Sequence, residues 1–329
     1  MNTIFFFLSE KLRSIDIGSL HVNDYHRGYI RRMLPVIDYY VDIYSEALTW
    51  VCSQSRRPLG ELTIVDYGGG EGFFSLFAKH IGVHSVIYVD MNPEATDTAD
   101  KLSKAFGIGP DEMVTGDSLV LKQWCHAHRV CPDAIVGMDV IEHIYCLDEF
   151  FNDLIDIFHQ MPMVFTTAST PYNRRIVRKL HKVMKADELG DKTHEGFVNV
   201  RRNFIHTHYP DMDEAKLNYW ATNTRGLIYD DILRAIDCES PNLLRDKYNT
   251  CDPSTGSWTE RILPTDDYRQ LLMPYGYTLA ERNGFYNIHR EGIKGILSSF
   301  YNRRLQHNKN RHLAPFLFLF ASPKVTLEN

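Results

Sequence analysis

The segment from Leu62 to Ser75, LTIVDYGGGEGFFS, constrains the fold of this chain more than any other. A short apolar run ends at Asp66, and Gly68, Gly70 and Gly72 follow at alternate positions before a helical pattern begins. A buried strand that passes through glycines into a helix lets the backbone approach a ligand closely, with helix N–H groups pointing at it. The segment therefore predicts a nucleotide-type binding site.

The spacing of these glycines decides which kind of nucleotide the site takes. A dinucleotide fingerprint needs glycines at the first, third and sixth positions, but the sixth position counted from Gly68 is Phe73. A P-loop would need Gly-Lys-Ser/Thr, which does not follow here. The D-x-G-x-G-x-G pattern instead resembles the first motif of class I S-adenosylmethionine (SAM) methyltransferases. The resemblance implies that Asp66, Gly68, Gly70 and Gly72 bind SAM.

Four later segments continue this resemblance in the same order. VHSVIYVD ends in Asp90, where the family uses an acidic side chain to accept both ribose hydroxyls of SAM. EMVTGD ends in Asp117, where similar enzymes hold the adenine amino group. DAIVGMDVIEHI and MVFTTASTPYNR resemble the fourth and fifth strands of the branch that includes the ubiquinone-pathway O-methyltransferases. The residues alone also allow Asp90 and Asp117 to act as caps of the helices that follow them.

The alternation of strand and helix patterns predicts an α/β fold with a parallel sheet. The resemblance implies a Rossmann-like seven-stranded methyltransferase sheet whose last strand, APFLFLFASPK, is antiparallel. We expect an N-terminal helical segment (1–57), a SAM-binding core (58–171), a mostly helical insert after strand 5 (172–257) and a C-terminal part of the core with the last helix and strands 6 and 7 (258–329). The insert is expected to lack a large core of its own and to cap the carboxyl edge of the sheet, where ligands bind in open α/β folds.

Candidate catalytic residues follow the fourth strand, where Asp139, Glu142 and His143 have the spacing D-x-x-E-H. These positions share one face if the segment turns helical. Methyl transfer from a sulfonium is an in-line displacement, so the protein has to position and deprotonate the acceptor. Imidazole side chains titrate near neutral pH, and His143 is therefore the predicted general base.

A similar E-x-x-E-H motif binds a divalent cation in the ubiquinone-pathway and small-RNA 3′-end methyltransferases, together with a later histidine. The resemblance implies a Mg²⁺, Mn²⁺ or Zn²⁺ site formed by Asp139, Glu142, His143 and His194. This chain departs from the motif because Asp139 replaces the first glutamate. In the alternative interpretation, Glu142 and His143 cap the turn and hydrogen-bond the backbone, as in metal-free relatives.

Composition limits the partners and the compartment. The formal net charge of −6 disfavours a dedicated nucleic-acid-binding protein. The longest apolar stretches fall far below the roughly 20 residues that cross a bilayer, so no membrane span is predicted. Six cysteines without a C-x-x-C pair predict a reducing, cytoplasmic location. The basic run from Arg174 to Lys185 is either a solvated amphipathic helix or a groove for an anionic acceptor.

The leading functional interpretation is a SAM-dependent methyltransferase that methylates an oxygen of a small-molecule or glycan-type acceptor, with Glu142 and His143 near the methyl group. Two alternatives stay open. The D-x-x-E-H spacing with a later histidine also suggests a 2′-O-methyltransferase of RNA ends, and the glycine loop alone would suit a non-catalytic SAM-binding regulatory protein. The sequence predicts neither the acceptor nor the oligomeric state.

Overall fold

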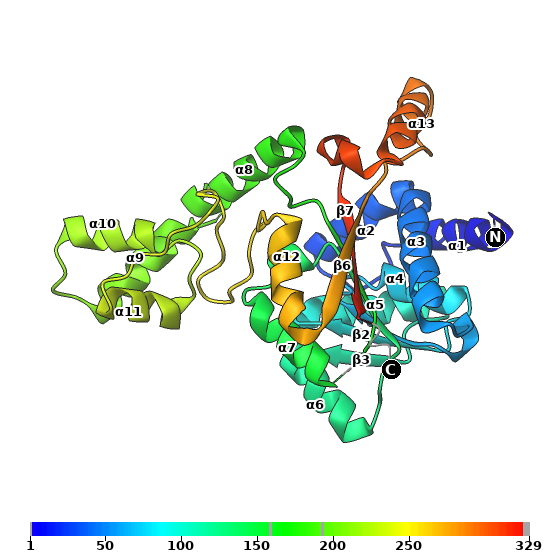
Figure 1. Ribbon diagram of the computed structural model, residues 1–329, viewed down its shortest axis with the longest axis horizontal. Coiled ribbons are helices and arrows are strands. Elements are labelled where there is room, and N and C mark those ends of the chain that lie inside the picture. The colour runs from blue at the N-terminus through cyan, green and yellow to red at the C-terminus, as the bar shows by residue number, and fades with distance from the viewer. Residues whose placement is uncertain (1, 158–159, 192–193, 325–329) are drawn as a thin grey trace.

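The computed structural model describes residues 2–157, 160–191 and 194–324 (Figure 1), so the last five residues of the predicted C-terminal part lie outside the described residues. One seven-stranded sheet has the order β3-β2-β1-β4-β5-β7-β6. Strands β1 to β5 pair in parallel, and β7 is antiparallel to both β5 and β6. The predicted seven-stranded α/β sheet is confirmed. The strands are β1 (Thr63–Tyr67), β2 (Ser85–Asp90), β3 (Glu112–Thr115), β4 (Ala134–Met138), β5 (Met163–Thr167), β6 (Tyr277–Asn283) and β7 (Leu317–Pro323).

Helices cover both faces of this sheet, and others lie in two long connections. Those around the sheet are α1 (Asn2–Arg13), α2 (Asp24–Met33), α3 (Ile37–Ser55), α4 (Phe73–His80), α5 (Pro93–Phe106), α6 (Ser118–His128), α7 (Leu147–Ile157) and α12 (Thr265–Leu272). The connection from β5 to β6 also holds α8 (Arg174–Leu189), α9 (Phe197–His208), α10 (Glu214–Asn223) and α11 (Tyr229–Asp237), and the connection from β6 to β7 holds α13 (Ile293–Leu305). The sequence pattern of the insert predicts helices near 174–186, 211–222 and 229–236, so α9 has no predicted counterpart, and neither has α13.

The strands divide their side chains between two apolar layers, as the two-residue period of a strand requires. Ile64 packs with α3 and α4, whereas its neighbour Val65 packs with α6, α7 and α12 on the other face. In β7, Phe318 joins the first layer and Leu319 the second. The sheet is therefore covered on both sides, and its strand ends are left for ligands.

Helices α9, α10 and α11 extend away from the sheet, and α8 leads to them (Figure 1). They surround a small apolar core made by Ile205, Leu217, Trp220, Ala221, Ile232 and Ile236. This core is small, and the expectation that the insert lacks a large core of its own stays a prediction. The core forms because α9, which the sequence pattern did not reveal, supplies Ile205 against α10 and α11.

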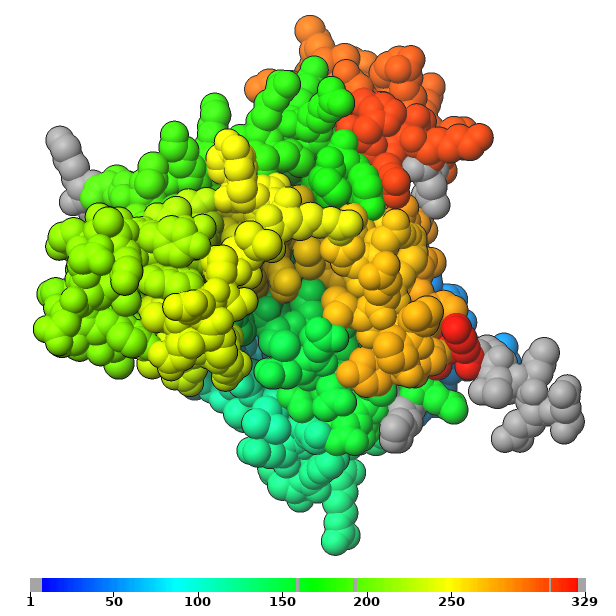
Figure 2. Space-filling view, turned by 60° about the vertical axis from the view of Figure 1, so that its left-hand side comes forward, coloured from blue at the N-terminus to red at the C-terminus, as the bar shows by residue number. Residues whose placement is uncertain are grey.

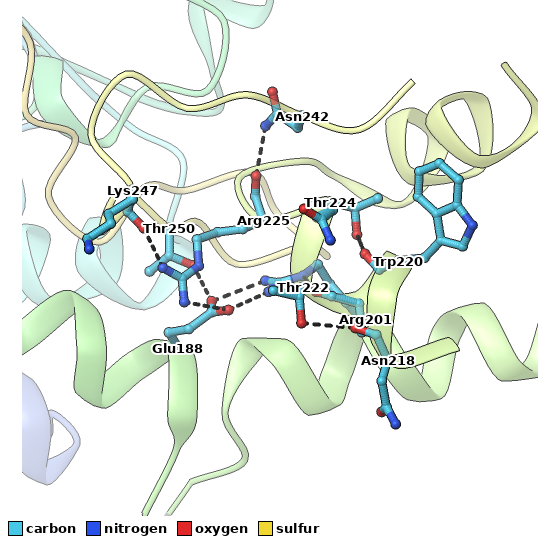
Figure 3. Close-up of polar contacts among 12 residues, drawn as sticks. Glu188, Arg201, Asn218, Trp220, Thr222, Thr224, Arg225, Asn242, Lys247 and Thr250 are labelled. Carbon is cyan, nitrogen blue, oxygen red and sulfur yellow. Dashed lines mark hydrogen bonds and ion pairs between the residues drawn. The ribbon is translucent and has the colours of Figure 1, made fainter. Parts of the chain in front are cut away.

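A buried ionic network joins the parts of the insert (Figure 3). Glu188, near the end of α8, accepts hydrogen bonds from Arg201 Nη2 of α9 at 2.6 Å and from Thr250 Oγ1 at 2.7 Å. Arg225 Nη2 lies 3.0 Å from the same carboxylate. Arg201 is fully buried and also donates through Nε to the carbonyl of Ala221 at 2.9 Å. One carboxylate therefore fixes α8, α9 and the returning chain relative to one another.

No helix in the described part of the chain is long and apolar enough to cross a membrane.

Candidate functional site

A cavity of about 270 Å³ lies where β1 passes through the glycine loop into α4. Gly68, Gly70 and Gly72 have φ values of 69°, 53° and 81°, a region that other L-residues rarely adopt. A Cβ on Gly68 would lie 2.3 Å from Cγ2 of Val140, whereas a Cβ on Gly70 would meet no atom within 4 Å. Gly68 therefore permits close packing against the loop after β4, and Gly70 opens its backbone to the cavity.

The N-terminal helices α2 and α3 cover this cavity. Tyr25 and Tyr29 of α2 and Tyr40 and Tyr44 of α3 line it. The buried ring of His26 joins α2 to the glycine loop, with Nδ1 2.9 Å from Oε1 of Glu71. The sequence pattern predicted a helical N-terminus, but these tyrosines and the histidine were missed as site residues. The helical spacing of these residues shows that, within each helix, they share one face. It does not show which part of the protein packs against that face.

The insert does not line this cavity: within the described ranges, all lining residues come from 25–44, 66–74, 90–95 and 138–139. It contacts the loop after β4 instead. Tyr145 Oη donates to Oδ2 of Asp231 on α11 at 2.5 Å and accepts from the N–H of Ile228 at 3.2 Å. The insert therefore lies against the segment that holds the candidate catalytic residues.

Four carboxyl groups line the cavity, from Asp66, Glu71, Asp90 and Asp139, and none of its described lining residues is Lys or Arg. Asp90 Oδ2 accepts from the N–H of Gly70 at 2.9 Å, and its Oδ1 accepts from the N–H of Asn92 at 2.8 Å. Burial raises the pKa of Asp90, and it raises the pKa of Glu71 against the opposing bond from His26. A cavity of this charge attracts a cationic ligand and repels a phosphate.

Asp90 and Asp117, the two predicted strand-end carboxylates, differ in position. Asp90 lines the cavity, and Asn92, rather than Asp90, caps α5 by accepting from the N–H of Glu94. Asp117 caps α6 by accepting from the N–H of Val120 at 3.0 Å, and it is absent from the described lining of the cavity. In this structure Asp117 has the geometry of a helix cap, and its contact with adenine stays a prediction.

Asp66 is fully buried behind the glycine loop. Its Oδ2 accepts from Ser75 Oγ at 2.6 Å, and burial raises its pKa to about 7, from an ordinary value of 3.8. At pH values between these two pKa values, Asp66 has lost its proton in the unfolded chain but keeps it in the folded protein. The contribution of protonated Asp66 to the free energy of unfolding is therefore complete at acidic pH. It is lost as the pH rises toward 7, by about 1.4 kcal/mol per pH unit.

We therefore expect the free energy of unfolding of the ligand-free wild type to fall relative to that of Asp66→Asn between pH 5 and pH 7. Above pH 8 the difference between the two proteins should no longer change. Asparagine keeps the shape and the acceptor for Ser75 but has no proton to lose. Urea unfolding at four pH values measures this difference. Asp117→Asn, the same change at an exposed cap, is the control. A wild-type-minus-Asp66→Asn difference that does not vary with pH would contradict the buried, protonated state.

The loop after β4 positions Asp139 and Glu142. Asp139 has a φ of 50°, its N–H donates to Thr166 Oγ1 at 2.9 Å, and its Oδ1 accepts from the same hydroxyl at 3.0 Å. It remains open to the cavity. Glu142 lies in the short 3₁₀ helix Ile141–His143 and is buried, and its Oε2 has no hydrogen-bond partner among the described residues. Burial, together with the nearby Asp139 and Glu260 carboxylates, raises the pKa of Glu142 well above its usual range.

His143 is held by the chain that returns from the insert. Its Nδ1 lies 2.7 Å from the carbonyl oxygen of Trp258, and the N–H of Trp258 donates to the carbonyl of His143 at 3.1 Å. A carbonyl can only accept, so Nδ1 carries the proton in this contact. Neutral His143 therefore has its lone pair at Nε2, which is the form a general base requires.

Glu260, like Glu71 of the cavity, is an acidic residue that the sequence analysis missed. Ser169 Oγ donates to its Oε2, and its charge raises the pKa of both Asp139 and Glu142, although burial is the larger cause for each. It follows the insert, more than a hundred residues after Glu142, and no local motif marks it. Only the return of the chain to the strand ends brings it to this cluster.

The four predicted metal ligands do not come together. His194 is exposed, and its Nδ1 lies 3.1 Å from Oδ1 of Asp191, in the connection between α8 and α9. Across residues 2–157, 160–191 and 194–324, no three His, Cys, Asp or Glu side chains are arranged to hold a metal ion. The side-chain positions therefore do not fit the implied cation, and the divalent cation stays a prediction.

Comparisons with known proteins give short or distant similarities. No family model matches the chain. The ribosomal protein L11 methyltransferase of a Cyanothece species is 32% identical over 69 residues, which are 21% of this chain. The match spans only 23% of the length of that curated relative.

Three solved structures of methyltransferases are similar to this chain. Magnesium protoporphyrin IX methyltransferase from Synechocystis is 12% identical with a TM-score of 0.43, and the match covers 89% of this chain and 87% of that one. A SAM-dependent methyltransferase from Archaeoglobus fulgidus is 11% identical with a TM-score of 0.43, over 89% and 99%. An O-methyltransferase family protein from Burkholderia thailandensis is 12% identical with a TM-score of 0.38, over 87% and 59%.

Proposed function

We propose that this chain, which has the seven-stranded fold of the class I SAM-dependent methyltransferases, binds SAM in the glycine-loop cavity and transfers its methyl group to an oxygen of a small-molecule or glycan-type acceptor. The observation that carries the proposal is the cavity itself. It combines a glycine loop with four carboxyl groups, and its described lining contains no Lys or Arg.

The chemistry of SAM matches this lining. The cofactor carries a sulfonium and an ammonium against one carboxylate, so its net charge is positive. Carboxylates attract such a ligand, and the faces of Tyr25, Tyr29, Tyr40 and Tyr44 can add cation–π attraction. A dinucleotide or nucleoside triphosphate would bring a net negative charge and its phosphates to the same groups. The lining therefore favours SAM over the phosphate-bearing nucleotides that use similar glycine loops.

The proposed roles of the carboxyl groups follow from their position in the cavity, whereas the role of His143, which is absent from the described lining, follows from its tautomer. Asp90 accepts the ribose hydroxyls, Glu71 and Asp139 provide the negative surroundings for the cationic part of SAM, and Asp66 supports the glycine loop through its hydrogen bond with Ser75. His143 takes a proton from the acceptor hydroxyl through Nε2, and Trp258 holds it in the required tautomer. The insert contacts the loop that carries His143 and is proposed to select the acceptor. The free thiols of the described cysteines agree with the proposed reducing, cytoplasmic compartment.

Replacing Asp90 by alanine is expected to weaken SAM binding at least about tenfold, because two hydrogen bonds to a charged acceptor are lost. Isothermal titration calorimetry with SAM measures the change. Asp97→Ala, which removes an exposed carboxylate paired with Lys101 on α5, is the control and should bind SAM normally. Unchanged affinity in Asp90→Ala would refute the assignment of this strand end.

Turnover is tested by adding the protein and labelled SAM to cell extract and searching by mass spectrometry for species that gain a methyl group. A labelled small molecule or glycan supports the proposal. A labelled RNA end would favour the 2′-O-methyltransferase alternative. SAM binding without any labelled product would favour a regulatory protein.

A further inference from the structure

Helix α13 presents an apolar face to solvent. Ile293, Ile296, Leu297 and Phe300 are 74%, 71%, 50% and 50% exposed. Their spacing of three and four residues puts them on one side of the helix. The helix projects from the body at the upper edge of the view (Figure 1, orange). Single exposed apolar residues are common, but a continuous apolar face on a projecting helix marks an interaction surface.

Cations surround this face. Arg290, Lys294, Arg303 and Arg304 are exposed, and none of them forms an ion pair with a described residue. Between Gly284 and Ala314 the sequence has six Lys and Arg residues and only Glu291 as an acid, whereas the whole chain has a formal net charge of −6. The positive charge is therefore concentrated around α13.

A groove of about 910 Å³ runs between α13 and the beginning of α8. Lys294 and Leu297 of α13 line one side, and Arg174 and Arg175 of α8 line another. No Asp or Glu occurs among its described lining residues. Figure 2 shows the two segments, orange and green, side by side at the top of the molecule. The groove offers unpaired cations at the edge of the apolar face, which suits a phosphate group.

We propose that α13 and this groove dock the protein on an anionic membrane surface. The apolar face enters the boundary between headgroups and acyl chains, and the surrounding cations contact lipid phosphates, as in amphipathic helices that lie in the interface plane. This interaction is separate from the proposed methyl transfer and does not depend on it.

Charge and the apolar face together favour an anionic membrane over two other partners, a second copy of this chain and an RNA strand. A second copy in a symmetric dimer would place the same cationic surface opposite itself, and the like charges would repel. An RNA strand matches the charge, but three of the four residues of the apolar face are aliphatic, and Arg304 already lies over the ring of the fourth, Phe300, at 4.7 Å from its centroid. An anionic bilayer satisfies both the charge and the apolar face.

Sedimentation of the full chain with lipid vesicles tests the proposal. We expect binding to vesicles that contain about one third phosphatidylserine, little binding to pure phosphatidylcholine, and release in high salt. Ile296→Glu should weaken binding to the anionic vesicles at least about tenfold, because it removes an apolar side chain from the face proposed to enter the bilayer and adds a negative charge. Leu243→Glu, the same kind of change at a residue that is 89% exposed in the insert, is the matched control and should bind like the wild type.

Circular dichroism and thermal unfolding establish that both variants are folded. The proposal is wrong if the folded wild type ignores anionic vesicles, or if Leu243→Glu loses binding as much as Ile296→Glu. It is also wrong if light scattering shows a dimer that Ile296→Glu separates while no variant binds vesicles, because a second copy then covers α13. Binding of RNA without binding of vesicles would likewise overturn it.

Discussion

His143→Ala is expected to lower the rate of methyl transfer by about 10²–10⁴-fold while SAM binding stays normal, because it removes the proposed general base. His143 can act as a base because its imidazole ring is held in one tautomer. The carbonyl of Trp258 fixes the proton on Nδ1 and leaves the Nε2 lone pair available. The rate is measured as transfer of labelled methyl into the acceptor found in extract, and calorimetry measures SAM affinity in the same preparation. Near wild-type turnover in His143→Ala would remove this residue from the mechanism.

Chelation separates the two mechanisms that the D-x-x-E-H segment suggested. Because the described side chains do not assemble the four predicted ligands, we expect EDTA to leave turnover unchanged. Loss of activity in EDTA that one divalent ion restores, and that Glu142→Ala abolishes, would show that a metal is required. In that outcome a rearrangement around Glu142 and Glu260 would be needed to complete the site.

Glu188→Ala is expected to destabilise the insert by about 3–5 kcal/mol, because it leaves the buried guanidinium of Arg201 without its counter-charge. Thr250 and Arg225 lose the same partner. Urea unfolding followed by tryptophan fluorescence measures the effect, since the indole of Trp220 lies in the core of the insert. The sheet and its glycine loop should keep their affinity for SAM, because the insert does not line that cavity in the described ranges.

The insert itself supplies the control for this change. Glu214→Ala removes an exposed carboxylate from its pair with Arg202, and such surface pairs contribute about 0–1 kcal/mol. Similar unfolding midpoints for Glu188→Ala and Glu214→Ala would mean that the network in Figure 3 contributes little to the insert.

Local sequence patterns determined the sheet and the glycine loop. The central strands β1, β2, β4 and β5 are short, mostly apolar runs, and the positive φ values of Gly68, Gly70 and Gly72 favour the one residue without a Cβ. The sequence also predicted the position of Asp90 beside the glycine loop. Strands β1 and β2 are neighbours that pair in parallel, so the end of β2 lies next to the loop that follows β1. These features depend on a few consecutive residues and on one chain topology.

Tertiary structure decided which distant residues complete the site. Glu260 reaches Asp139 and Glu142 only after the insert returns to the strand ends, and His26 reaches Glu71 only because α2 packs over the loop. The same packing leaves His194 beside Asp191, away from the motif that predicted its role. Contacts between residues far apart in the chain depend on how whole elements pack, and no pattern within a short segment encodes that packing. The sequence by itself therefore specified the glycine loop, and the tertiary structure selected the groups that surround it.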